Sequence, residues 1–361
     1  MILGRSEDLM RCAYNQEVRR IVVSGLVGVV MMSAFVGTSV AQPTESKTST
    51  AQPALAQYSS AQSSAVQAKS ALAPASYKSC SYPPNPNPSV VKRNAISWKA
   101  QGFTNPVAGI DISMWQHPSD KPINFVGLKS KYAISFVFIK GSDGGNRDSG
   151  KSKYWFKIDS AAAKSAGLII GPYHYAVPGQ MAAGEMIVPK ANRTNTSRVK
   201  QATAHRLADA KLQAKVALSQ SLGNPKGDLP LTLDFEERPC GWSWKQTGEW
   251  TRDFLLEFER LSGRRPMIYA NGYFVNNLNA VHVTKGPAAP TEFFDFSRYT
   301  LWVASWGPKL GTKPRAVPIW GTSWKFWQFT SDGKLTGVPS TRTDLDVWFG
   351  TLNQLKKLAA S

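Results

Sequence analysis

Two carboxylates stand two residues apart at the end of an apolar run in this chain. The segment 231–237 reads LTLDFEE, so Asp234 and Glu236 flank Phe235. Successive residues of a strand point to opposite faces, so the two acids share one face and Phe235 takes the other. Like charges on a buried face raise the pKa of one acid while the other stays ionised, which suits a general acid beside an anionic stabiliser. Ion pairs with Lys or Arg are the structural alternative.

Two further acids stand at other expected strand ends. Asp111 lies in GIDIS, and Asp344 lies in TDLDV. In α/β barrels the functional side chains gather at the C-terminal ends of the strands. A D-x-E motif is weak alone, but with these two acids it predicts a catalytic cluster of Asp111, Asp234, Glu236 and Asp344. Glu237 is expected to face away from the cluster and either to cap a backbone group or to pair with another side chain.

Aromatic and amide side chains occur at the same strand ends. They are Tyr173, Tyr175, Tyr269, Trp302, Trp306, Trp327 and Gln328. Aromatic walls with a few polar groups are typical of small-ligand sites, and sugars stack on rings while their hydroxyls meet acids and amides. The pattern predicts that Tyr173, Tyr175, Tyr269, Trp302, Trp327 and Gln328 bind a carbohydrate. His174 is equally compatible with a buried core histidine.

Short β-rich runs alternate with helical stretches and must position these residues. The expected strands are 109–113, 136–140, 168–175, 231–235, 266–270, 301–304, 324–329 and 345–349. The expected helices are 154–166, 199–222, 249–261 and 272–279. This alternation favours a parallel sheet with helical crossovers, and eight strands favour closure. Because the helical signal fades after residue 279, we expect an α/β fold, an irregular TIM-like β/α barrel with eight strands and fewer than eight helices.

The N-terminal part differs in composition from the rest. Residues 21–41 form an apolar run that follows Arg19 and Arg20 and ends in Ser-Val-Ala, which predicts a signal peptide over 1–41. An uncleaved membrane anchor is the alternative. Residues 42–105 are rich in Ala, Ser, Gln and Pro and predict a linker. Residues 106–361 remain as the catalytic barrel of a protein that is secreted, extracellular or held in the cell wall.

The charge indicates which partners to expect. The chain has 43 Lys and Arg against 24 Asp and Glu, a net charge of +19. The signal and linker carry +1 and +5 of this, so residues 106–361 retain +13. Such a surface favours anionic cell-wall polymers. No nucleic-acid recognition motif is present, so we expect no nucleic-acid partner. Membrane contact is expected only through an uncleaved signal, and the protein is expected to be a monomer.

Cysteine and histidine usage argues against metal chemistry. The chain has three Cys and four His, without a CxxC or HExxH motif, so no metal and no cofactor is expected. Removal of the signal would leave Cys80 and Cys240. Two cysteines in an oxidising compartment often pair, so we predict a disulfide between them. Two separate thiols are the alternative.

The motifs together resemble glycoside hydrolase family 25, the Chalaropsis-type lysozymes. Over 109–350 the resemblance rests, in order, on GIDIS with Trp115-Gln116, FVFIKGSDG, AGLIIGPYHYA, LTLDFEE, PMIYAN, LWVASW and WKFWQFTSDGKLTGVPSTRTDLDVWFG. It implies an irregular eight-stranded barrel. It also implies hydrolysis of the β-1,4 bond between N-acetylmuramic acid and N-acetylglucosamine in peptidoglycan.

The resemblance also implies roles for individual residues. Glu236 would be the general acid and Asp234 would orient or stabilise the substrate acetamido group. Asp111 and Asp344 would complete the acid cluster, and Tyr175 and Trp302 would contact substrate. We favour attack by the substrate's own acetamido oxygen, with inverting and direct-nucleophile routes left open.

Two departures and two other functions remain. Asp346 stands where the family more often has Asn, with its side-chain direction open, and residues 179–223 are longer than usual. A chitinase-like barrel glycosidase would share strand-end acids and aromatic walls, but its D-x-x-D-x-D-x-E run is absent. A non-catalytic cell-wall-binding protein would need only the net positive charge of the chain, to bind anionic wall polymers.

Overall fold

The computed structural model describes residues 96–145, 150–179, 196–280, 296–307, 311–315 and 324–361. The predicted signal peptide and nearly all of the predicted linker lie outside these residues. Within them, no helix combines the length and the apolar character needed to cross a membrane.

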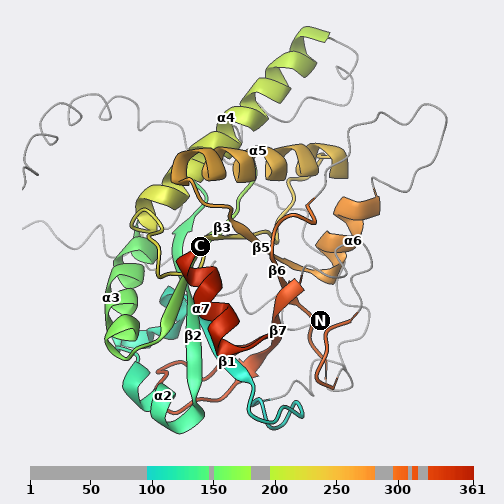
Figure 1. Cartoon of the computed structure of the whole chain (residues 1–361). Helices are drawn as coiled ribbons and strands as arrows, with labels where there is room; N and C mark the ends of the chain where they lie inside the picture. The colour runs from blue at the N-terminus through green and yellow to red at the C-terminus, as the bar shows by residue number, and fades with distance from the viewer. Residues whose placement is uncertain (1–95, 146–149, 180–195, 281–295, 308–310, 316–323) are drawn as a thin grey trace, which may run out of the picture. The chain divides into compact units, whose positions relative to one another are not determined.

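Eight strands form a closed barrel in chain order, as the sequence predicts (Figure 1). The strands are β1 Val107–Ile112, β2 Ile134–Asp143, β3 Ile169–Tyr175, β4 Thr232–Asp234, β5 Met267–Asn271, β6 Leu301–Ala304, β7 Trp324–Gly333 and β8 Thr343–Trp348. Each of the eight expected strands overlaps one of these. The predicted irregular barrel is confirmed.

The last strand runs against the others. Strands β1 to β7 pair in parallel, whereas β8 is antiparallel to both β7 and β1. Residues 334–342 join β7 to β8 without a helical crossover, and a connection of this kind permits antiparallel pairing. The expectation of a wholly parallel sheet is therefore wrong at β8. Since β8 is reversed, its first residues lie at the same end of the barrel as the last residues of the other strands.

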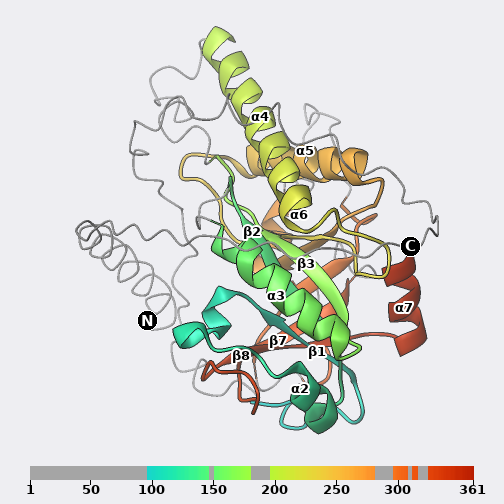
Figure 2. The same cartoon turned by 90° about the vertical axis from the view of Figure 1, so that its left-hand side faces the viewer.

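Six α-helices are found in the described residues, fewer than the strands. They are α2 Phe125–Tyr132, α3 Lys151–Ser165, α4 Thr196–Gln220, α5 Trp244–Ser262, α6 Gly272–Ala280 and α7 Leu352–Ala360. All four predicted helices are present, but α2 and α7 were not predicted. Helix α5 begins five residues before the predicted position 249, where Ser243 and Gln246 form a capping box. Figure 2 shows α3 along β2 and β3, and α4 against α5.

The strands separate two hydrophobic cores. The outer core lies between strands and helices and contains the outward-facing residues of the strands, such as Ile110 of β1, Val137 of β2 and Trp327 of β7. The inner core fills the barrel with aromatic side chains, among them Phe136 and Phe138. A β-carbon on Gly109 would lie 2.2 Å from the Phe136 ring, so the glycine lets that ring pack inside. Because the interior is filled, polar chemistry is confined to the end where β1 to β7 finish.

Residues 96–105 pack with the barrel. Trp98 is buried, and its indole nitrogen Nε1 donates a hydrogen bond to the backbone oxygen of Asp346 at 2.7 Å. The ring of Phe103 lies 5.7 Å from that of Trp327 and 5.6 Å from that of Phe329. The predicted linker end at residue 105 is therefore wrong, because apolar side chains before it are part of the outer core.

Candidate active site

The structure brings the four predicted acids to one end of the barrel. Asp111 ends the inward-facing set of β1, and Asp234 is the last residue of β4, with Glu236 two residues beyond it. Asp344 pairs in register with Asp111 across β1 and β8. Asp111 and Asp234 are buried, whereas Glu236 and Asp344 are half-buried.

The hydroxyl of Tyr173 lies within the electrostatic reach of all four acids. Burial raises the pKa of Tyr173 well above its usual range, and the charges of Asp111, Asp234, Asp344 and Glu236 add to the rise. The pKa of Tyr269 is raised by burial and by the same four groups. The two phenols therefore stay neutral and can donate hydrogen bonds among the carboxylates.

Glu236 acts electrostatically on its buried neighbour Asp234. Burial raises the pKa of Asp234 well above its usual range, the charge and hydrogen bonding of Glu236 raise it further, and the positive charge of Lys140 opposes the rise. Among the described residues, no donor reaches the buried Oδ1 of Asp234. The raised pKa favours the protonated form of Asp234, so this carboxyl can hold a proton beside Glu236.

Gln328 connects Asp111 to the aromatic side chains. Its Nε2 donates to Asp111 Oδ2 at 2.8 Å, and its Oε1 accepts from the Tyr269 hydroxyl at 2.9 Å and from Trp306 Nε1 at 3.0 Å. The amide is buried, but Trp306 is 40% exposed. Gln328 therefore fixes the Asp111 carboxylate and an aromatic ring that faces solvent.

A buried ion pair was not predicted from the sequence. Lys140 and Asp143 lie at the end of β2 and are both buried, with Lys140 Nζ 2.6 Å from Asp143 Oδ2. The ammonium also lies 4.6 Å from the centre of the Tyr175 ring, and the Tyr175 hydroxyl donates to Glu237 Oε1 at 2.8 Å. Position at a strand end, the signal that identified the four acids, would also have identified Lys140 and Asp143. The expected pairing of Glu237 is observed.

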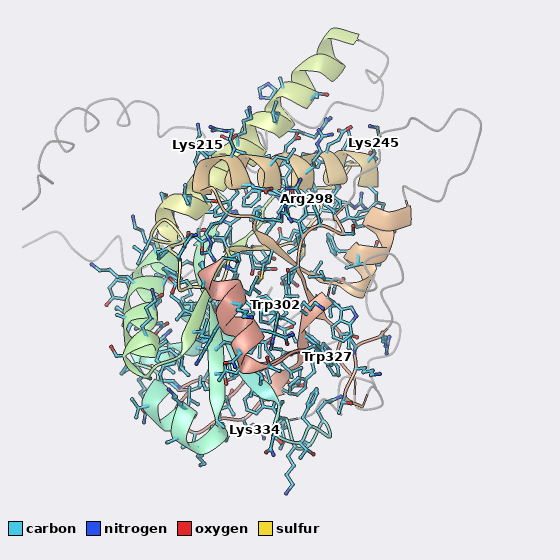
Figure 3. All side chains as sticks on the ribbon, in the orientation of Figure 1. Lys215, Lys245, Arg298, Trp302, Trp327 and Lys334 are labelled. Atoms are coloured by element: carbon cyan, nitrogen blue, oxygen red, sulfur yellow. The ribbon has the colours of Figure 1, made fainter. Side chains whose placement is uncertain are left out.

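The two predicted tryptophans lie on opposite sides of the barrel wall (both labelled in Figure 3). Trp302 belongs to the inner core and stacks on Phe138, with ring centres 4.1 Å apart. Trp327 is fully buried in the outer core, where its Nε1 donates to the backbone oxygen of Ser305 at 2.7 Å. Because Gln328 faces inward, its neighbour Trp327 must face outward. The prediction that Trp327 binds substrate is therefore wrong.

His174 also faces away from the acids. It is fully buried, and its ring nitrogens contact Ser142 Oγ at 2.7 Å and Gln213 Oε1 at 3.3 Å. Burial lowers the pKa of His174 to about 4. The histidine is a satisfied core residue, the structural alternative that the sequence left open.

Two other predictions concern cysteine and metal. Cys240 is disulfide-bonded. Cys80 lies outside the described residues, so its pairing with Cys240 stays a prediction. In the part of the chain that the structure describes, no group of three His, Cys, Asp or Glu side chains is arranged to hold a metal ion.

Comparisons with known proteins agree with this geometry. Residues 201–338, which include Asp234 and Glu236, match the family model of Glycosyl hydrolases family 25. The curated protein "Lysozyme M1" of Streptomyces globisporus is 28% identical over 263 residues, which cover 71% of this chain and 72% of that protein.

Two solved structures share the fold. The bacterial lysozyme of Streptomyces coelicolor is 25% identical, with a TM-score of 0.52, over 72% of this chain and 99% of that one. A family GH25 lysozyme from Aspergillus fumigatus is 26% identical, with a TM-score of 0.51, over 71% of this chain and 100% of that one. On the matched segment, the relatives and the barrel, this chain is similar to the lysozymes of glycoside hydrolase family 25.

Proposed function

We propose that this protein is a muramidase that hydrolyses the β-1,4 bond between N-acetylmuramic acid and N-acetylglucosamine in peptidoglycan. The observation that carries the proposal is the placement of Asp234 and Glu236 at the end of β4, at the same end of the barrel as Asp111 and Asp344. The match of residues 201–338 to the family 25 model and the similarity to known lysozymes support the same activity.

The two carboxyls differ in exposure, and this difference suggests their roles. Glu236 is half-buried and can reach a glycosidic oxygen, so it acts as the general acid that protonates the leaving sugar. Asp234 is buried below it and orients the acetamido group, whose oxygen attacks the anomeric carbon. Asp111 and Asp344 contribute negative charge that stabilises the oxocarbenium-like transition state. The anomer of the first product, observed by NMR, distinguishes this retaining route from an inverting one.

Substrate contacts fall to the residues that solvent can reach. Tyr175 is half-buried at the end of β3, and Trp306 is 40% exposed just after β6. Trp115 is 42% exposed just after β1. We assign sugar stacking to these rings. Gln328 acts from below through its hydrogen bond to Asp111, and Tyr269 acts through its hydrogen bond to Gln328. Tyr173 is buried and lies within the electrostatic reach of the four acids. Trp302 is too buried to stack on a sugar and is assigned a supporting role.

Purified cell walls provide the test of this function. We expect the enzyme to clear a wall suspension and to release new reducing ends that belong to N-acetylmuramic acid. Chitin, a polymer of N-acetylglucosamine alone, should be cut far more slowly. Preferred cutting of chitin would favour a chitinase-like glycosidase. Binding to walls without new reducing ends would favour the non-catalytic alternative.

The place of action is part of the proposal. A cleaved signal over 1–41 would deliver the enzyme to the outside of the cell or to the wall, as a monomer. N-terminal sequencing of the secreted protein tests the cleavage after Ala41. An intact N-terminus in the membrane fraction would instead indicate an anchor.

The basic surface is proposed to hold anionic wall polymers. Several cations on the α4–α5 side pair with acids: Arg206 and Lys245 pair with Glu249, and Arg298 pairs with Glu259 (Lys245 and Arg298 are labelled in Figure 3). In contrast, Lys153 and Lys157 are exposed in the first turns of α3. These two lysines start from the end of the barrel that carries the acids, because α3 follows β2.

We therefore expect salt to slow lysis of whole walls but to change turnover of a short soluble glycan little, because screening acts on encounter. Replacing both Lys153 and Lys157 with Glu should lower wall lysis several-fold and weaken its salt dependence. The same change at Lys356 and Lys357 on α7, at the opposite end of the barrel, is the control. Equal salt inhibition on both substrates would contradict the proposal.

A further inference from the structure

Asp346 is a fully buried acid inside the barrel that the proposed mechanism does not use. It lies on β8 between Gly109 of β1 and Gln328 of β7, its register partners. Its Oδ1 accepts a hydrogen bond from Trp302 Nε1 at 2.8 Å. The side chain is 0% exposed, so it faces the interior and contacts no solvent.

The second carboxyl oxygen of Asp346, Oδ2, is available for an interaction with Asp111. The register of β1 and β8 pairs Asp346 with Gly109, which lies on the same face of β1 as Asp111. A side-chain hydrogen bond between the two carboxyls contributes to the pKa of each, while Asp111 Oδ2 accepts from Gln328 Nε2. Among the described residues, Asp346 Oδ2 has no N–H or hydroxyl donor, and no Lys, Arg or His pairs with either acid. Two carboxyls can form a hydrogen bond only when one of them carries a proton.

We propose that Asp111 and Asp346 share one proton and that Asp346 is a positioning residue for the catalytic cluster. The shared proton joins the two carboxyls, while Trp302 and Gln328 hold their outer oxygens. Asp111 is thereby fixed at the end of the barrel that carries the acids, and the pair presents one negative charge instead of two. The effect on catalysis rests on the proposed muramidase function, whereas the shared proton does not.

The surrounding groups favour retention of this proton. Burial raises the pKa of both acids well above the usual range. Asp346 also faces Asp344 on its own strand, and Asp111 faces Glu236 beyond β4. The phenols Tyr173 of β3 and Tyr269 of β5 face the same cluster and stay neutral.

The remaining neighbours do not remove the proton. Trp302 of β6 and Gln328 of β7 are uncharged donors. Lys140 of β2 lowers the pKa of Asp234 and is itself paired with Asp143. A second ionisation of the Asp111–Asp346 pair would place two like charges together in a buried site, which is strongly unfavourable.

Asn at position 346 provides a discriminating variant. Its amide nitrogen can donate to Asp111 and its oxygen can accept from Trp302, so Asp346→Asn conserves the geometry. It also conserves the charge, because an ionised Asp111 beside Asn carries the same single charge as the proton-sharing pair. Asp344→Asn is the comparison, because it removes the half-buried carboxylate that stands opposite Asp111 in the register of β1 and β8. Asp346→Ala removes the contact to Asp111 altogether.

The shared proton is tested without activity. Infrared spectra of the full protein at neutral pH should show the carbonyl band of a protonated carboxylic acid, and Asp346→Asn should lose one such band. An unchanged band in Asp346→Asn would overturn the shared proton. This measurement decides the matter even for a protein that proves inactive on peptidoglycan.

The positioning role is tested on the pH profile of kcat/KM. Asp344→Asn should move the basic limb to lower pH, because loss of a negative charge makes the general acid easier to ionise. Asp346→Asn should leave that limb in place and retain turnover within about threefold, whereas Asp346→Ala should lose at least tenfold in kcat. An acid shift in Asp346→Asn as large as that in Asp344→Asn would show that Asp346 is ionised. Full activity in a folded Asp346→Ala would overturn the positioning role.

Discussion

Replacement of Glu236 with Gln is expected to lower the turnover of peptidoglycan by about 10²–10⁴-fold, the usual contribution of general acid–base catalysis. Gln retains the shape and hydrogen bonding of the side chain but has no proton to give to the leaving oxygen. The side chain is half-buried, so its substitution should leave the thermal unfolding midpoint nearly unchanged. The initial rate of reducing-end release and a thermal melt measure the two effects.

Glu257→Gln is the matched control for this change. Glu257 lies on α5, outside the barrel, and its carboxylate pairs with Arg260 at 2.8 Å. Its loss should leave turnover unaltered. Near-native turnover in Glu236→Gln would show that another group protonates the leaving sugar, and the proposed assignment of roles to Asp234 and Glu236 would fail.

The acid cluster could be predicted from the sequence because its signal is local. Strand residues alternate between two faces, so Asp234 and Glu236 share a face wherever the strand lies in the barrel. The barrel brings strand ends together, and this places Asp111 beside the pair. The antiparallel direction of β8 was not predicted. The sequence pattern predicts helical crossovers, which give parallel strands, but no helix joins β7 to β8. Asp344 was nevertheless placed correctly in the acid cluster, because the first residues of a reversed strand lie at the end of the barrel where the other strands finish.

Other features depended on contacts that no local pattern contains. Trp327 and Gln328 are consecutive, so only one of them could line the interior, and the alternation rule applied to Asp234 and Glu236 would have excluded Trp327. The sequence alone leaves the side-chain direction of Asp346 open, although the alternation rule places Asp346 on the same face as Asp344. Its contact with Asp111 depends on the register of β1 against β8. That register is a long-range pairing between two segments far apart in the sequence, so no local pattern predicts it.

Replacement of Asp234 with Asn is expected to lower turnover and, at the same time, stabilise the fold. Turnover should fall by about 10²–10³-fold, a magnitude typical of the loss of one stabilising group in a water-poor site. The wild-type carboxyl is buried, and one of its oxygens has no donor in the part of the chain that the structure describes. The amide of Asn carries no charge and can donate a hydrogen bond to Glu236.

The gain in stability should depend on pH with a definite sign. The folded-state pKa of Asp234 is raised, first by burial and then by Glu236, so the folded protein binds the proton more tightly than the unfolded chain does. The associated stability is present at low pH and is lost as the pH rises through the folded-state pKa. The loss is about 1.4 kcal/mol for each pH unit that separates the folded-state pKa from that of the unfolded chain. Asp234→Asn has no such loss, so its advantage in unfolding free energy should grow from acid to alkaline pH.

Thermal unfolding of both proteins across a series of pH values measures this difference. Asp253→Asn is the control, because Asp253 lies on α5 and pairs with the partly exposed Arg252 at 2.8 Å. Its stability should stay within about 0.5 kcal/mol of the wild type. If Asp234→Asn gained nothing between acid and alkaline pH, burial of Asp234 would carry no electrostatic strain. The cluster would then be an ordinary set of satisfied carboxylates, whereas a catalytic cluster is expected to sacrifice stability for function.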